Sequence, residues 1–128
     1  MSVHPVPTPS APPAAGPYSP AVRAGDWIVL AGQVGLDPAT GRMVDGGVEA
    51  QARRTLANIA AVLDDCGASL SDVAKTTVFV TDMAAYGAVN DAYASFFGDH
   101  RPARSVVGVA ALPMGAAVEV ELWAYRED

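Results

Sequence analysis

Apolar residues recur at three- and four-residue spacing in two stretches of the chain, and this pattern predicts two amphipathic helices. The first helix is expected over residues 48–65 and ends before Gly67, a common helix stop. Its apolar face consists of Ala52, Leu56, Ile59, Ala60 and Leu63. Polar side chains, among them Asn58, mostly lie off this face. The second helix is expected to begin after Asp82, which can cap it, and to end at Gly98. Its apolar stripe consists of Tyr86, Val89, Tyr93, Phe96 and Phe97.

Shorter apolar runs with β-branched or aromatic residues predict strands on either side of these helices. The expected strands cover residues 26–31, 72–81, 104–110 and 117–125. The short connection 112–115 contains a proline and a glycine and suits a hairpin between the last two strands. Two amphipathic helices can cover only one face of one sheet, so the chain is expected to form a two-layer α+β fold.

The last predicted strand carries different chemistry on its two faces, because neighbouring side chains of a strand alternate. One face is apolar and comprises Val118, Val120, Leu122 and Ala124. The other face combines two carboxylates with two large aromatic rings, at Glu119, Glu121, Trp123 and Tyr125. Such a face is unusual for open solvent and favours a subunit interface that contains a polar site.

The composition is that of a folded domain with an unusual N-terminus. The chain has 128 residues, which fits one domain, and 51% of them are hydrophobic whereas only 17% are charged. Seven of its ten prolines lie within the first 20 residues. Residues 2–17 are therefore expected to form an extended or mobile arm without regular structure that contributes little to the core. The predicted organisation is an arm, residues 1–14, followed by a single domain, residues 15–128.

Charge and cysteine content exclude several classes of protein. The net charge of −6 and the single lysine, Lys75, argue against nucleic-acid binding, which needs clustered basic residues to neutralise phosphates. Cys66 is the only cysteine, so no intrachain disulfide can form, and a cytoplasmic location is expected. The N-terminus lacks the basic and apolar regions of a secretory signal. The longest uncharged apolar stretch, residues 106–118, is too short to span a bilayer, so no membrane association is expected.

Most catalytic motifs are missing from the sequence. There are only two histidines, His4 and His100, and no Cys-x-x-Cys pair, so neither a His/Cys metal site within one chain nor a metal is expected. No phosphate-binding loop or dinucleotide fingerprint occurs either, and no cofactor is expected.

Arg104 is the residue with the clearest capacity to bind a ligand. It lies at the start of a predicted apolar strand, where a guanidinium must either reach solvent or bind an anion. One interpretation is an arginine that points outward or pairs with Glu119 or Glu121. The other is a guanidinium fork for a small carboxylate. In the predicted hairpin, Arg104 and Glu119 lie about 13 Å apart at ~3.3 Å per residue, so they could share a ligand only across a subunit boundary.

Six short motifs follow one another in order from about residue 15 to residue 125. They are Gly16-Pro-Tyr-Ser19, Ala31-Gly-Gln33, Lys75-Thr-Thr-Val-Phe-Val80, Val89-Asn90, Pro102-Ala-Arg-Ser105 and Val118-Glu-Val-Glu121. The ordered set resembles the RidA (YjgF-type) reactive intermediate deaminase family over nearly the whole chain. Pro-Ala-Arg-Ser alone would be a weak signal, whereas the complete set is specific.

The resemblance implies a homotrimer of a chorismate-mutase-like α+β fold, with one mixed sheet covered on one face by two helices and ligand clefts between subunits. It also implies cofactor-free hydrolysis of reactive enamines and imines, such as 2-aminoacrylate and 2-imino acids, to 2-keto acids and ammonia. Arg104 would bind the substrate carboxylate, and Glu119 would position the attacking water and assist proton transfer. Tyr18 and Asn90 would line the cleft, and the backbone at Gly32 would contact the ligand.

Two positions depart from the family pattern. Val106 stands where many members carry cysteine, and Ala31 where many carry serine or threonine. Val106, as a substrate-binding residue, would make the cleft drier and shift the preference toward more apolar imino acids. Two alternatives to the deaminase are a non-catalytic trimeric binder of small carboxylates and a ribonuclease or translation inhibitor. The presence of Arg104 favours the enzyme, and the acidic charge argues against the ribonuclease.

Overall fold

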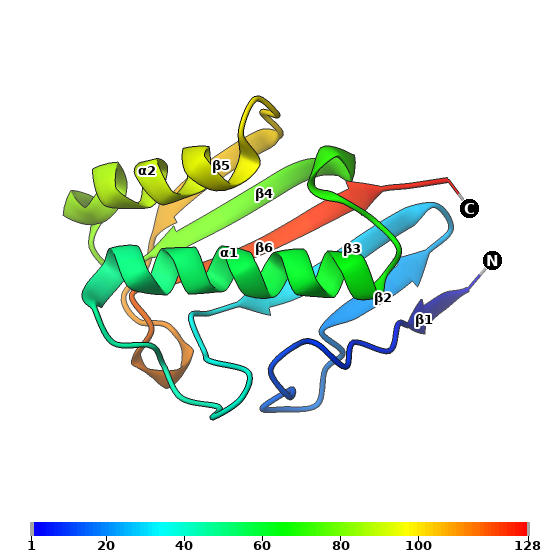
Figure 1. Ribbon diagram of the computed structural model, residues 1–128, viewed down its shortest axis with the longest axis horizontal. Coiled ribbons are helices and arrows are strands. Elements are labelled where there is room, and N and C mark those ends of the chain that lie inside the picture. Colours follow the sequence, from blue (N-terminus) through cyan, green and yellow to red (C-terminus); the bar gives the residue numbers. More distant parts are fainter. Residues whose placement is uncertain (1, 128) are drawn as a thin grey trace.

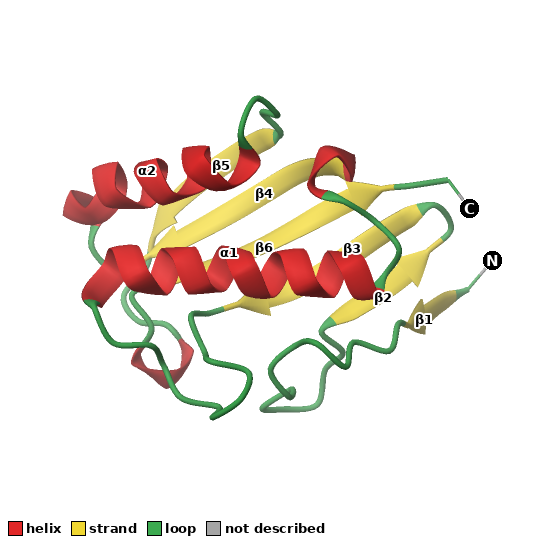
Figure 2. Ribbon diagram, in the orientation of Figure 1, coloured by secondary structure: helices red, strands yellow, loops and turns green. Residues whose placement is uncertain are grey.

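The computed structural model describes residues 2–127 and contains, within them, a six-stranded sheet and two long helices (Figure 1). In chain order the elements are β1 (Val3–Pro5), β2 (Ala21–Ala24), β3 (Trp27–Gln33), α1 (Gly47–Asp65), β4 (Val73–Val80), α2 (Tyr86–Phe97), β5 (Ala103–Gly108) and β6 (Val118–Tyr125). Short 3₁₀ turns precede β4, α2 and β6. Both helices lie on the same face of the sheet (Figure 2), so the predicted two-layer α+β fold is confirmed.

The strand order across the sheet is β1-β2-β3-β6-β4-β5. β4 and β5 run parallel, whereas every other neighbouring pair of strands is antiparallel, so the sheet is mixed, as expected. α2 connects β4 to β5, because parallel neighbours need a crossover rather than a tight turn.

Both helices form where the apolar periodicity predicts them. The stripe of α1 is buried, with exposed fractions of 0% to 2% for Ala52, Leu56, Ile59 and Leu63. α2 follows a 3₁₀ turn that Asp82 caps by accepting a hydrogen bond from the backbone N–H of Ala84 at 2.9 Å. The two helices therefore close the inner face of the sheet and leave its other face uncovered.

β6 lies inside the sheet, and its alternation is as predicted. The four apolar residues of its inner face are 0% to 2% exposed, namely Val118, Val120, Leu122 and Ala124. On the uncovered face, Trp123 and Tyr125 are 47% and 43% exposed. Trp27 of β3 packs edge-to-face against both rings, with centroids 6.1 and 5.1 Å away. A cluster of aromatic side chains thus stands on the face that no helix covers.

The predicted hairpin between the last two strands is wrong. β4 lies between β5 and β6 and pairs with both of them. The connection, residues 109–117, reverses the chain at Met114 and Gly115, whose φ angles are 59° and 68°, and carries it past β4. β6 takes an inner position because its entire alternate face is apolar and buried, whereas β5 is mostly exposed and forms an edge.

The proline-rich arm is ordered, so the expectation of a segment without regular structure is wrong. β1 pairs with β2 as an edge strand of the sheet, a position where the missing N–H of proline is tolerated. Ser10 donates from its backbone N–H and from its hydroxyl to the Asp65 carboxylate at the end of α1, both at 2.9 Å. Pro12 is buried, and Val6 and Ala11 pack against the core. The arm therefore contributes to the hydrophobic core, contrary to the expectation that it would contribute little.

Candidate active site

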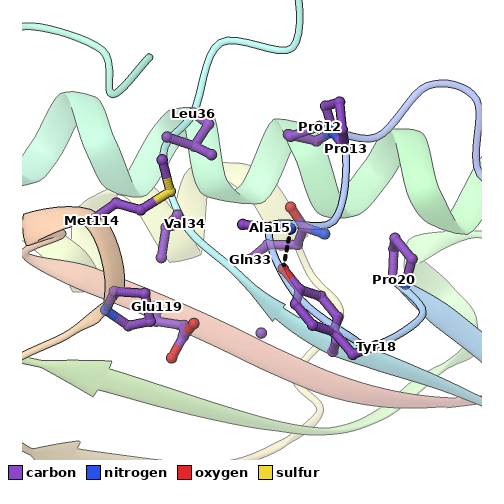
Figure 3. Close-up of a pocket in the computed structure, with 13 residues that line it drawn as sticks. Pro12, Pro13, Ala15, Tyr18, Pro20, Gln33, Val34, Leu36, Met114 and Glu119 are labelled. Carbon is purple, nitrogen blue, oxygen red and sulfur yellow. Dashed lines mark hydrogen bonds between the residues drawn. The ribbon is translucent and has the colours of Figure 1, made fainter. Parts of the chain in front are cut away.

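A cavity of about 370 Å³ opens beside the end of β3, next to the arm and to the loop before β6 (Figure 3). Its lining comes from segments far apart in the sequence and includes Pro12, Tyr18, Gly32, Leu36, Met114 and Glu119. Glu119 is the one charged side chain among the lining residues, and most of the others are apolar.

The carboxylate of Glu119 reaches this cavity because Gly32 has no side chain. A Cβ atom at Gly32 would lie 2.7 Å from both Cδ and Oε2 of Glu119, which is too close for any van der Waals contact. Gly32 belongs to the irregular stretch of β3 between Leu30 and Gln33, where the register with β6 shifts. The carboxylate therefore occupies space that a larger residue would fill, and it points into the cavity (Figure 3).

The pKa of Glu119 is raised above its usual value. Burial is the main cause, and the negative charge of Glu121 raises the pKa further. Both carboxylates lie on the uncovered face of β6, two residues apart. A carboxylate whose pKa lies closer to neutrality is better matched to taking a proton from water and returning it to a substrate.

Tyr18 lies at the same cavity and is 51% exposed. Its hydroxyl oxygen accepts a hydrogen bond from the backbone N–H of Ala15 at 3.3 Å (Figure 3). Because the oxygen is the acceptor of this bond, the hydroxyl proton remains for a ligand. The structure thus brings Tyr18, Gly32 and Glu119 together, in the way that the resemblance implies.

Two polar residues of α1 hold the wall of the cavity. Asn58, expected off the buried face, is fully buried and donates from Nδ2 to the carbonyls of Val34 (3.2 Å) and Leu36 (2.8 Å). Gln51 accepts, through Oε1, a hydrogen bond from the backbone N–H of Ala117 at 2.8 Å, just before β6. Periodicity places Asn58 wrongly because its partners are backbone carbonyls of a loop, and such partners leave no pattern in the sequence.

Arg104 lies on the edge strand β5 and packs against α2. Its Nη1 donates to Oδ1 of Asn90 at 2.8 Å, and its Nη2 donates to the hydroxyl of Tyr86 at 3.0 Å. Cζ of the guanidinium lies 4.8 Å from the ring centroid of Tyr93 and 5.6 Å from that of Tyr86. A hollow of about 290 Å³ adjoins the guanidinium and is lined in part by Asn90, Tyr93 and Pro102.

All of these partners are neutral, so the charge of Arg104 is not compensated by them. Within residues 2–127, no carboxylate forms a salt bridge with it. The interpretation of an arginine paired with Glu119 or Glu121 is therefore wrong. A guanidinium that is fixed in place by neutral acceptors and aromatic rings can still bind an anion.

Val106 follows Arg104 on the same side of β5. It is half-buried and packs against the core, and it lines neither the cavity nor the hollow beside Arg104. Within one chain, Arg104 and Asn90 thus lie together beside the hollow, whereas Val106 lines neither this hollow nor the cavity around Glu119.

The site consists of two half-sites, the cavity around Glu119 and the hollow beside Arg104, and these do not meet within one chain. Arg104 is level with Thr76 of β4, whereas Glu119, on the other side of β4, is level with Phe79. Three residues and two strand spacings separate them, about 14 Å in the plane of the sheet. Arg104 also shares the inner face with the buried Thr76, and Glu119 shares the uncovered face with Phe79. A ligand can contact both groups only if a second chain supplies one of them.

The apolar periodicity of α2 predicts Tyr86 and Tyr93 as parts of a stripe that faces the core and does not predict them in a site. Together with Asn90 they follow a spacing of four and three residues, which places all three on one face of α2. Three side chains with polar tips on one helical face, combined with an arginine on the strand that this face covers, are the signal that could have found them.

The described residues 2–127 contain no cluster of three or more His, Cys, Asp or Glu side chains suited to a metal ion. No helix in this part of the chain is long and apolar enough to cross a bilayer. The two half-sites supply two guanidinium groups, those of Arg101 and Arg104, together with the carboxylate of Glu119 and several neutral hydrogen-bonding groups.

Comparisons with known proteins identify the family of this chain. The family described as Endoribonuclease L-PSP matches residues 8–126. A 2-iminobutanoate/2-iminopropanoate deaminase from Mus musculus is 46% identical over 114 residues, which are 89% of this chain and 84% of that protein. The crystal structure of RidA from an Antarctic Psychrobacter species has a TM-score of 0.91 at 38% identity, covering 95% of this chain and 98% of the other. That of E. coli TdcF with bound serine has a TM-score of 0.91 at 37% identity, covering 97% and 99%. The chain therefore belongs to the RidA (YjgF-type) family, as its ordered motifs imply.

Proposed function

We propose that the protein hydrolyses reactive enamines and imines, such as 2-aminoacrylate and 2-imino acids, to 2-keto acids and ammonia. The observation that carries this proposal is the guanidinium of Arg104, which is held by neutral partners only and is left to bind a carboxylate. The mouse relative is named for this activity at 46% identity, and the serine in the TdcF structure is itself a small carboxylate.

The proposed reaction needs orientation and proton transfer and no cofactor. Arg104 holds the substrate carboxylate, and Glu119 holds a water molecule against C2 of the imine. As the water oxygen bonds to C2, Glu119 takes a proton from it and passes this proton to the nitrogen. The carbinolamine that forms then loses its hydroxyl proton to the nitrogen, the C–N bond breaks, and ammonia leaves. Both protons of the water end on ammonia, and its oxygen becomes the keto oxygen.

We infer that the complete site forms between the subunits of a homotrimer. The separation of the half-sites supports this inference, because Arg104 and Glu119 project from opposite faces of one sheet. The uncovered face supports it too, since Trp27, Trp123 and Tyr125 are 39%, 47% and 43% exposed there. An exposed aromatic cluster of this kind is typical of a protein–protein contact.

The substrates are inferred to be imino acids with apolar side chains. The wall of the cavity around Glu119 is formed largely by apolar residues, among them Pro12, Leu36 and Met114. Ala31, which also lines this cavity, adds no polar group where family members often have one. The net charge of −6 argues against RNA as a substrate, despite the description of the matching family, and the single cysteine is consistent with action in the cytoplasm.

The test of this function is an assay of keto-acid formation from imino acids that are generated in situ. An amino-acid oxidase generates imino acids from alanine, leucine and methionine, and formation of the keto acids is followed with and without the protein. The rate is expected to rise in proportion to the protein added, with leucine and methionine favoured over alanine. A rate equal to that of the buffer, combined with binding of the keto acids, would favour the non-catalytic binder instead.

The activity is expected to fall at acidic pH, because the proton-accepting form of Glu119 is lost as the pH falls through its raised pKa. Replacing Glu121 by glutamine removes the negative charge that adds to the effect of burial on this pKa, so the acid limb of log kcat/KM should move to lower pH. The measurement is the pH profile of keto-acid formation after subtraction of the uncatalysed rate.

The matched control is Glu49→Gln, at a surface carboxylate of α1 that pairs with Arg53. Its profile should coincide with that of the wild type. A profile of Glu121→Gln that does not move, or that moves to higher pH, would contradict a role for Glu119 as the titrating base.

A further inference from the structure

We propose that the hydroxyl of Tyr86 is a further binding group for the substrate carboxylate, acting beside Arg104. This inference rests on the proposed function in one respect only, namely that Arg104 binds a carboxylate. It assigns to the site a residue of α2 that the sequence motifs do not include.

The direction of one hydrogen bond carries the inference. Nη2 of Arg104 lies 3.0 Å from the hydroxyl oxygen of Tyr86, and a guanidinium has no acceptor atom. The tyrosine oxygen must therefore accept this bond, and its own proton must point elsewhere. Within residues 2–127 the structure gives this proton no acceptor, and Tyr86 is 39% exposed. The proton is thus available to a molecule that comes to the guanidinium.

The orientation of the Asn90 amide follows from the same fact, namely that a guanidinium can only donate hydrogen bonds. Its Oδ1 accepts the bond from Nη1 of Arg104 at 2.8 Å, so its amide group Nδ2 is the part that faces away from the guanidinium. Within residues 2–127, Nδ2 of Asn90 forms no hydrogen bond. Arg104, Asn90 and Tyr86 therefore each have an N–H or O–H donor left to offer, and a set of donors beside a positive charge fits an anion. A carboxylate can accept about four hydrogen bonds, which is more than one guanidinium fork supplies.

Tyr93, on the same face of α2, shows what a structural tyrosine looks like here. It is 6% exposed, and its hydroxyl lies 2.8 Å from Oγ1 of the buried Thr76. Its polar tip is thus committed to the core. Tyr86 differs because, among residues 2–127, the Arg104 cation is the only hydrogen-bond partner of its hydroxyl, and a hydroxyl that accepts from a cation becomes a better donor.

The expected effect of Tyr86 is on binding and not on the chemical step. The carboxylate carries the same charge in the substrate and in the transition state, so a donor to it stabilises both equally. Replacing Tyr86 by phenylalanine should therefore raise KM about tenfold and leave kcat within about twofold, as expected for one hydrogen bond to a charged group.

The experiment compares wild type, Tyr86→Phe and the control Ser95→Ala by calorimetry and by imine turnover. The calorimetric probes are 2-oxobutanoate and its uncharged amide. Ser95→Ala is a suitable control because it removes an exposed hydroxyl from α2 that lines neither the cavity nor the hollow beside Arg104. Circular dichroism checks that each variant folds.

The proposal expects Tyr86→Phe to weaken binding of 2-oxobutanoate about tenfold, to leave binding of the amide unchanged, and to raise KM with kcat retained. Ser95→Ala should match the wild type. Unchanged affinity for 2-oxobutanoate, equal losses for acid and amide, or a fall in kcat alone would each overturn it. If the wild type turns over no imine but binds 2-oxobutanoate through Tyr86, the proposed function fails and this inference stands. If it binds no carboxylate, this inference fails as well.

Discussion

Replacing Arg104 by lysine is expected to lower kcat/KM for imine hydrolysis about 100-fold, although the charge is retained. Lysine cannot present two parallel donors to a carboxylate, and it cannot donate to Asn90 and Tyr86 at the same time in the planar geometry of a guanidinium. The substrate carboxylate would then lose its fixed direction, so C2 would no longer lie against the water that Glu119 holds. A misplacement of about 1 Å is enough for a loss of this size.

The measurement is keto-acid formation, with circular dichroism and light scattering to check that the variant folds and assembles. Arg53→Lys is the matched control, because Arg53 lies on the outer surface of α1 in a solvent-exposed pair with Glu49. It should keep the wild-type rate. If Arg104→Lys also keeps most of that rate, Arg104 acts only as a structural residue of β5 and the proposed mechanism fails.

The parts of the fold that follow from local patterns could be predicted from the sequence. The stripe that includes Leu56 and Ile59 defines α1, and the alternation from Val118 to Ala124 defines β6, because each pattern depends only on the geometry of its own element. The order of the strands does not follow in this way. A short loop with Pro113 and Gly115 suits a hairpin locally, and the insertion of β4 between β5 and β6 is decided by which strand has a face to bury.

The arm shows a second limit of local reasoning. Its prolines exclude an inner strand, and local reasoning from them predicts an arm without any regular structure. An edge strand tolerates proline, however, and the anchor of the arm is a contact between Ser10 and Asp65, which are 55 residues apart. Contacts over such distances in the chain leave no periodic signal.

Some residues of the candidate site could be identified from local sequence patterns, whereas others depend on contacts between distant segments. Arg104 could be singled out because an arginine at the head of an apolar strand needs an explanation in any fold. The pairing of Glu119 with Gly32 depends on a close approach between two strands, and the part of Tyr86 depends on a helix lying over β5. The estimate of about 13 Å between Arg104 and Glu119 was close to the 14 Å of the sheet register but came from the wrong strand pairing. The conclusion that one chain cannot close the site is nevertheless the same.

Mixing two inactive variants is expected to restore activity, because each site needs Arg104 from one subunit and Glu119 from another. Glu119→Gln alone should retain carboxylate binding and lower turnover about 100-fold, since glutamine can hold the water but cannot accept its proton. Arg104→Lys alone should lose about 100-fold in kcat/KM for the reason given above. In trimers formed by co-expressing the two variants in equal amounts, about one quarter of the sites combine an intact Arg104 with an intact Glu119. The mixture should therefore show about one quarter of the wild-type activity per chain.

A second mixture makes the test quantitative. When the wild-type chain is co-expressed with a chain that carries both substitutions, a site shared between subunits is again intact in about one quarter of cases. A site within one chain predicts something different for both mixtures, namely no activity for the two single variants and about half for wild type with the double variant. Equal activity of the two mixtures supports the shared site, and light scattering should give a mass near three chains for each. No recovery in the first mixture, together with about half of the wild-type activity in the second, would place Arg104 and Glu119 in a site within one chain and would contradict the shared site.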